Sequence, residues 1–150
     1  QYFIPFIKSA QIVISDRHGD YAVLNVNGIT RRRLERESFV IISNFPAEIG
    51  TPRPGKYPAY EQACRLMENS TSVDQPLLTE LLETTCQTGE VKSVYSNVFN
   101  LTERVATNYY LFDYRRPHVI DLKEDLSAMT KPVYFAELFP GRQEAVEQKH

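Results

Sequence analysis

Ile12-Val13-Ile14-Ser15-Asp16-Arg17-His18-Gly19-Asp20-Tyr21-Ala22-Val23-Leu24 is the stretch of this sequence that predicts the fold most directly. Apolar runs stand at its two ends, and polar residues from Asp16 to Asp20 separate them. Short runs of this kind are typical of strands, and Gly19 between them can adopt the positive φ of a tight turn. The stretch therefore predicts a β-hairpin, with strands at residues 11–15 and 21–26.

The residues that follow extend this hairpin into an antiparallel meander. Asn27-Gly28 is a strong two-residue hairpin signal, and it leads into an arginine-rich strand or turn over residues 29–36. An apolar run then begins at Phe39 and stops at Ser43-Asn44 and a proline, which predicts a buried strand over residues 39–44.

Helical spacing replaces strand patterns in the middle of the chain. Pro58 opens the first predicted helix, where proline is tolerated. The apolar face of this helix consists of Tyr60, Ala63, Cys64 and Met67. Asp74 is the expected N-cap of a second, leucine-rich helix that includes Cys86 and ends with Gly89 at C′.

Strand patterns return in the last third of the chain. The expected elements are a strand over 91–101, a turn over 102–104, a strand over 105–114, a break over 115–117, a short strand over 118–122, a segment over 123–129, and a charged, amphipathic C-terminal segment. The order of elements predicts an α+β fold, with antiparallel sheet on one side and helices on the other.

Composition limits the classes of function. The chain has 150 residues, 42% of them hydrophobic and 24% charged, and a net charge of −2. This is the size of one ordinary domain, or of a fragment of a larger one, over residues 1–150. The charge gives no electrostatic reason to expect nucleic acid or an anionic membrane surface as partner, and we expect neither a membrane span nor a signal peptide.

The sequence holds no motif that predicts a metal or cofactor. It has no nucleophile elbow, P-loop, HExxH or GxGxxG pattern, and His18, His118 and His150 lack partners at metal-ligand spacing. Cys64 and Cys86 show no CxxC spacing, and whether they pair depends on helix packing that the sequence leaves open.

Ser43-Asn44-Phe45-Pro46 is the segment with the clearest chemical potential. An amide side chain at the end of a buried strand can orient a substrate carbonyl or stabilise an oxyanion. An Asn near a proline is also an ordinary turn starter, because its side chain bonds its own backbone. The residues alone leave both interpretations open.

Several segments, in order, resemble the linear amide C–N hydrolases, the group of choloylglycine hydrolases, penicillin acylases and related acyltransferases. The segments are Ile12–Leu24, Val40–Pro46, Tyr57-Pro58 with the following helix, Val94–Leu101 and Tyr109–Leu126. Together they cover about two thirds to four fifths of the chain, and each motif alone is only moderately specific.

This resemblance implies a fold and a reaction. The fold is a four-layer αββα sandwich, and the reaction is amide hydrolysis by an N-terminal cysteine whose own α-amino group is the base. The resemblance also implies that Asn44 is a polar group of the active site, on the side of the substrate and the oxyanion. Glu61 stands where the family has arginine, and Arg65, one helical turn later, is the expected substrate-binding replacement.

Residue 1 is Gln, so the resemblance implies a nucleophile outside this sequence. We therefore expect the C-terminal portion of an amidase, with an N-terminal half or partner chain that carries the nucleophile, a small acyl-amide substrate and no cofactor. Self-association would also cover an exposed sheet edge. The alternatives are a non-catalytic binding or structural module that keeps the fold, and an unrelated α+β domain.

Overall fold

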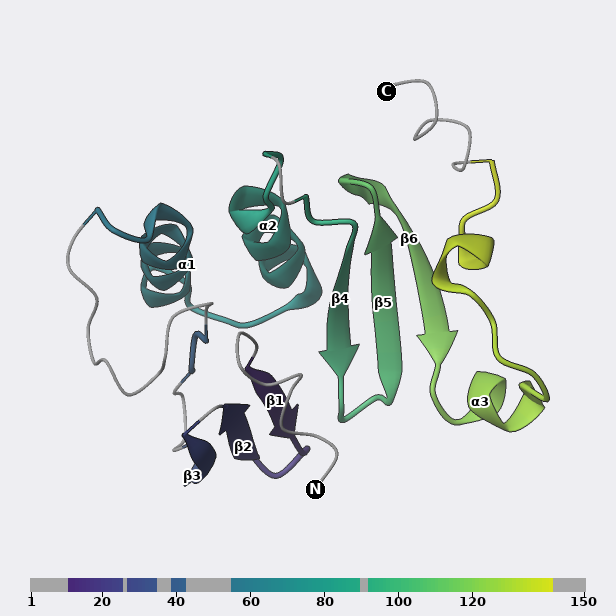
Figure 1. The fold of residues 1–150 in the computed structure, drawn as a ribbon, viewed down its shortest axis with the longest axis horizontal. Helices are drawn as coiled ribbons and strands as arrows, with labels where there is room; N and C mark the ends of the chain where they lie inside the picture. Colours follow the sequence, from purple (N-terminus) through teal and green to yellow (C-terminus); the bar gives the residue numbers. More distant parts are fainter. Residues whose placement is uncertain (1–10, 26, 35–38, 43–54, 90–91, 142–150) are drawn as a thin grey trace. The chain divides into compact units, whose positions relative to one another are not determined.

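The computed structural model describes residues 11–25, 27–34, 39–42, 55–89 and 92–141. These residues form two compact units, residues 1–71 and 72–150. The first contains the strands β1–β3 and helix α1, and the second contains α2, the strands β4–β6, α3 and the 3₁₀ helix η3 (Figure 1). The fold is α+β, with two three-stranded antiparallel sheets.

The first sheet confirms the first three strands of the predicted meander. Its strands are β1 (Ile12–Ser15), β2 (Asp20–Asn25) and β3 (Gly28–Arg33), in the spatial order β1-β2-β3. Both pairs are antiparallel, and the register places Ile14 opposite Ala22 and Ala22 opposite Arg31.

The two turns of this sheet rest on different residues. Gly19 has a φ of +85° in the first turn, as the sequence predicts for a glycine at that point. In the second turn Asn25 pairs with Gly28, so Gly28 is the first residue of β3. The hairpin at Asn27-Gly28 is thus present, but Gly28 belongs to the strand and not, as the dipeptide signal indicates, to the connection.

The predicted strand over residues 39–44 is wrong where it can be checked. Residues 39–42 form no strand, and the side chains of Phe39 and Val40 are exposed. Apolar β-branched residues favour a strand only when a neighbouring strand accepts their backbone hydrogen bonds and their side chains are buried. Residues 43 and 44 lie outside the described part of the chain.

Helix α1 (Pro58–Glu68) follows the prediction closely. Pro58 lies in its first turn, and its missing N–H costs nothing there because the first helical amides have no partner within the helix. Ala63 and Met67 of the predicted apolar face are buried. Cys64 is half-buried.

Helix α2 (Gln75–Thr85) begins as predicted and ends early. The Asp74 carboxylate accepts a hydrogen bond from the Leu77 amide at 2.9 Å, which is an N-cap. The helix ends at Thr85, and Cys86 is an extended C-cap. The expected C′ role of Gly89 and the helical position of Cys86 are therefore wrong.

The early end of α2 has a local cause. Thr84 and Thr85 are β-branched, and their hydroxyls bond back to the carbonyls of Glu80 and Leu81 at 2.8 and 2.7 Å. Such residues are weak helix formers. Their presence at the last two positions favours termination before a glycine is reached.

Replacing Asp74 with alanine should destabilise the second unit by about 0.5–2 kcal/mol, because the Leu77 amide loses its acceptor. Urea unfolding followed by circular dichroism measures the change. Asp74→Ser keeps an oxygen acceptor and should restore most of the loss. Equal destabilisation by both variants would contradict the capping role.

The second sheet has the order β4-β5-β6. Its strands are β4 (Tyr95–Asn100), β5 (Val105–Tyr110) and β6 (Asp113–Asp121). The turn at residues 102–104 is confirmed, but the single strand predicted over 105–114 is wrong. Leu111 and Phe112 form a tight turn with φ of +49° and +64°. Leu and Phe carry no turn signal, since they rarely adopt positive φ.

Strand β6 contains an irregularity at the predicted break. Its pairing with β5 shifts register between Asn108 and Tyr110, which leaves residues 114–117 opposite a single residue of β5. Pro117 lies in this segment, where a missing backbone donor is tolerated. The predicted break at 115–117 is therefore a bulge within one long strand.

Each face of the second sheet is covered in part. Helix α2 packs against one face, where the Tyr109 hydroxyl lies 2.7 Å from the Thr79 hydroxyl and the Tyr114 hydroxyl donates to the Leu82 carbonyl at 3.2 Å. The other face is covered by η3 (Phe135–Leu138) and Phe139, whose ring stacks on Tyr110 at a centroid distance of 5.4 Å.

Helix α3 (Glu124–Ala128) follows β6 directly. The Asp121 carboxylate accepts hydrogen bonds from the amides of Lys123 and Glu124 at 2.8 and 2.9 Å. These bonds lower the pKa of Asp121 below its usual value. Across the described ranges, none of the helices is both long enough and apolar enough to cross a bilayer.

Candidate functional site

The sequence predicts two site residues, Asn44 and Arg65, and the structure describes only Arg65. Asn44 lies outside the described residues, as do Ser43, Phe45 and Pro46. Arg65 lies on the third turn of α1 and is exposed. The structure therefore gives the surroundings of Arg65, while the position of Asn44 stays a prediction from sequence.

Arg65 is held by its own helix and directed to solvent. Its Nε donates to the Glu61 carbonyl at 3.4 Å, and its own carbonyl accepts from the Asn69 side chain at 2.8 Å. Among the described residues its guanidinium has no carboxylate partner. An exposed, unpaired guanidinium can bind a carboxylate or another anionic group in bidentate fashion.

Glu61 stands one helical turn before Arg65, at the position where the resemblance expects arginine. Its carboxylate accepts a hydrogen bond from the backbone amide of Gly55. Glu61 thus ties the segment before α1 to the helix. An arginine at this position would lack that acceptor, so the two residues have different structural roles here.

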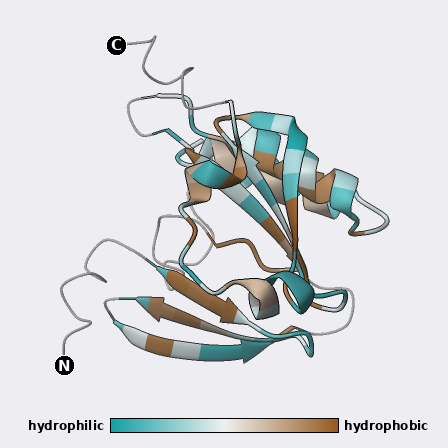
Figure 2. Cartoon of the chain, turned by 90° about the vertical axis from the view of Figure 1, so that its right-hand side faces the viewer, coloured by the Kyte–Doolittle hydropathy of each residue, from teal (hydrophilic) through white to brown (hydrophobic). Residues whose placement is uncertain are grey.

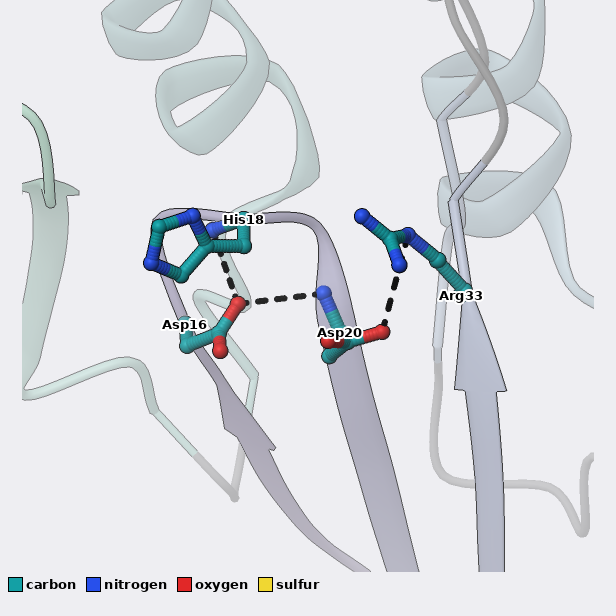
Figure 3. Close-up of polar contacts among 4 residues, drawn as sticks. All are labelled: Asp16, His18, Asp20 and Arg33. Carbon is teal, nitrogen blue, oxygen red and sulfur yellow. Dashed lines mark hydrogen bonds and ion pairs between the residues drawn. The ribbon is translucent and has the colours of Figure 1, made fainter.

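A second polar cluster lies at the β1–β2 turn (Figure 3). Asp16 Oδ1 accepts from the backbone amides of His18 at 2.8 Å and Asp20 at 3.1 Å. Asp20 in turn lies 3.8 Å from the Nε of Arg33, across the β2–β3 pair. His18 Nε2 accepts a hydrogen bond from Arg17 Nε at 3.4 Å.

These contacts assign the cluster a structural role in the turn. The backbone hydrogen bond from His18, together with that from Asp20, holds the pKa of the Asp16 carboxyl below its usual value. A carboxylate that stays ionised and is occupied by two backbone donors is a poor general acid.

Replacing Asp16 with asparagine should remove a pH-dependent part of the stability of the first unit. Because the folded-state pKa of Asp16 lies below the unfolded value of about 3.9, its contribution is complete above that pH and is lost as the pH falls through the folded pKa. Unfolding of Asp16→Asn should depend less on pH in the acidic range.

Carboxyl-carbon NMR titration measures the same effect directly. The Asp16 resonance should titrate below the model-peptide value, as should that of Asp121, whose carboxylate is bonded in a similar way. A normal midpoint for Asp16 beside a lowered one for Asp121 would refute the turn contact.

The buried amide of Asn108 and the half-buried amide of Asn97 were not recognised as candidates from the sequence. Asn97 and Asn108 face each other across β4 and β5, and His118 of β6 lies opposite Asn108. The Asn108 side chain donates to the carbonyls of Ala106 and His118 at 3.2 Å each. Asn97 Oδ1 is shielded from solvent and lacks a hydrogen-bond partner among the described residues. Strand alternation with apolar neighbours was the available signal for their burial.

The described part of the chain includes both cysteines of the sequence. Cys64 and Cys86 are both free thiols. The hydrogen bond with Cys64 raises the pKa of the Tyr60 hydroxyl, and burial raises that of Tyr114. Within the described ranges, His, Cys, Asp and Glu side chains form no group of three that could hold a metal ion.

Comparisons of this chain with models of protein families, with curated proteins and with solved structures found no match.

Proposed function

We propose that residues 1–150 are the C-terminal portion of an amidase that hydrolyses linear amide C–N bonds with an N-terminal cysteine outside this sequence. The observation that carries the proposal is the agreement between motif order and element order. The resembling segments coincide with the β1–β2 hairpin, the start of α1, β4, and β5–β6, in that sequence. Four of the five segments therefore have strand motifs on strands and the helix motif on a helix; the exception is Val40–Pro46, whose described residues 40–42 form no strand.

The proposed architecture is part of an αββα sandwich. Two antiparallel sheets and the helices on the chain between them agree with one half of such a fold. The nucleophile-bearing half, as an N-terminal segment or a partner chain, would supply the remaining strands. Self-association is the second way in which an open sheet edge can be covered.

The proposed reaction proceeds by acyl transfer. The cysteine thiolate attacks the amide carbonyl, the α-amino group takes the thiol proton and passes it to the leaving amine, and water then hydrolyses the thioester. The Asn44 amide would donate a hydrogen bond to the developing oxyanion. Arg65 would bind an anionic group of a small acyl-amide substrate.

One observation favours a second candidate, a binding or structural module without catalysis. Glu61 occupies the expected arginine position, and its carboxylate is engaged by the Gly55 amide. The substrate-binding cation is thus replaced by a residue with a structural role. This is what we expect of a protein that has kept the fold and lost the reaction.

The natural protein distinguishes the two candidates. Its intact mass and N-terminal residue should identify a polypeptide, or a pair of chains, with cysteine at a free N-terminus. Release of amine from acyl-amide substrates should require that cysteine, and its replacement by alanine should abolish the release. A natural protein without such a cysteine would refute the amidase and leave the binding module.

A further inference from the structure

The first sheet carries a hollow of about 330 Å³ near the β1–β2 turn. Its lining residues come from all three strands and the adjoining turn: Ile14, Ser15, Asp16, Asp20, Tyr21, Ala22, Arg31 and Arg32. Figure 2 colours the apolar segments of this sheet brown, on the strands nearest the N-terminus. The hollow lies within one unit, so its shape does not depend on how the two units are arranged.

The register groups apolar side chains with one of the two lining arginines. Ile14, Ala22 and Arg31 lie side by side across β1, β2 and β3, and therefore project from the same face of the sheet. Two positions further along the strands, Ile12, Leu24 and Ile29 form the next row on that face. One face of the sheet thus presents two rows of mainly aliphatic side chains with a guanidinium at their side.

These aliphatic side chains are unusually open to solvent. Ile14 is 58% exposed and Ile29 is 62% exposed. Apolar surface in a contiguous row is a feature of binding sites. Binding of a ligand that covers this surface is favoured by a free energy proportional to the apolar area removed from water.

The charges around the hollow are unequally engaged. The Asp16 carboxylate accepts two backbone hydrogen bonds, and Asp20 is paired with Arg33. Among the residues that the structure describes, the side chains of Arg31 and Arg32 make no hydrogen bond or ion pair. The guanidinium groups of Arg31 and Arg32 are therefore available to pair with an anionic group of a ligand, although the two carboxylates of the lining keep their negative charge.

We infer that this hollow binds a small organic anion with an aliphatic body, of which a medium-chain carboxylate is the simplest form. The carboxylate pairs with the Arg31 guanidinium, which can form two parallel hydrogen bonds to it. The aliphatic chain lies over Ile14 and Ala22 toward the row that contains Ile12. The inference does not rest on the proposed amide chemistry.

The structure predicts both charge selectivity and chain-length dependence. Octanoate should bind the full chain in saturable fashion and perturb the NMR resonances of β1–β3. Octanamide and octylammonium, which lack the negative charge, should bind at least about tenfold more weakly. Affinity should rise about threefold to fourfold for each added methylene from butanoate upward, until the aliphatic rows are covered.

Two arginines of the same strand provide matched variants. Arg31→Gln should weaken octanoate binding at least about tenfold, because the proposed charge partner is lost. Arg33→Gln removes an equal charge from the same strand, but its residue pairs with Asp20 and does not line the hollow, so binding should stay within about threefold of the parent. Ala22 lines the hollow, so the larger side chain of Ala22→Leu should fill part of it. This variant should weaken the binding of octanoate and of octanamide by similar factors.

Circular dichroism and thermal unfolding establish that each variant folds. Equal losses in Arg31→Gln and Arg33→Gln would overturn the proposal, because they would indicate a general charge effect. Equal affinity for octanoate and octanamide would do so as well. A stable dimer by light scattering, with no octanoate binding, would show that a second copy covers this face and would also overturn it.

Discussion

Phe139→Ala should lower the free energy of unfolding of the second unit by about 3–5 kcal/mol, the loss typical of removing a buried phenylalanine. The side chain is only 4% exposed. Its ring lies 5.3 Å from that of Phe135 and 5.4 Å from that of Tyr110, measured between centroids, and His118 meets it edge-on at 5.9 Å. Alanine would remove the contacts with all three rings.

The matched control for Phe139 lies on the same sheet. Phe99 of β4 is 56% exposed, so Phe99→Ala removes the same ring without opening a comparable cavity and should cost less than about 1 kcal/mol. The chain has no tryptophan, so urea unfolding is best followed by tyrosine fluorescence and circular dichroism. If both variants lost similar stability, the segment after α3 would not cover this face of the sheet.

The segment that contains Phe139 shows why part of the fold was beyond prediction from sequence. The hairpin of β1 and β2 follows from local information, because a glycine-containing polar turn separates two apolar runs. The N-cap at Asp74 is local in the same sense. By contrast, the 3₁₀ helix η3 is defined by aromatic contacts with residues of β4 and β5, far away in sequence.

The turn at Leu111 and Phe112 is the clearest case of tertiary structure overriding local preference. Both residues have positive φ, which costs free energy for side chains of this size. Pairing of β5 with β6 over residues on both sides of the turn offsets that cost. Strand propensity alone therefore predicted one strand over residues 105–114, whereas the sheet has two strands separated by this turn.

The residues of the candidate site also differ in whether local sequence or tertiary contacts determine their position. A helical spacing was sufficient to place Arg65 one turn after Glu61 on α1, and the structure agrees. The burial of Asn108 depends on which face of β5 is covered, and this is decided by η3 and Phe139 rather than by the strand itself. The role of Asn44 rests on the resemblance of its segment and is open to a direct test.

Asn44→Ala should lower kcat of the nucleophile-containing natural protein by about 100–1000-fold, with little change in KM. A donor to the oxyanion contributes mainly in the transition state, where the charge develops, and loss of one such donor has an effect of this size. The measurement is steady-state amine release from an acyl amide, with folding of each variant checked by circular dichroism. Asn44→Asp should be at least as severe, because a carboxylate repels the oxyanion.

Asn69→Ala provides the matched control, since it makes the same amide-to-methyl change at an exposed residue at the end of α1. It removes a hydrogen bond to the Arg65 carbonyl and should leave kcat within about twofold of the parent. A rise in KM at constant kcat for Asn44→Ala would instead make Asn44 a substrate-orienting group that acts equally in the ground and transition states. Unchanged kcat and KM in a folded Asn44→Ala protein would return Asn44 to the ordinary turn role that its proline neighbour also predicts.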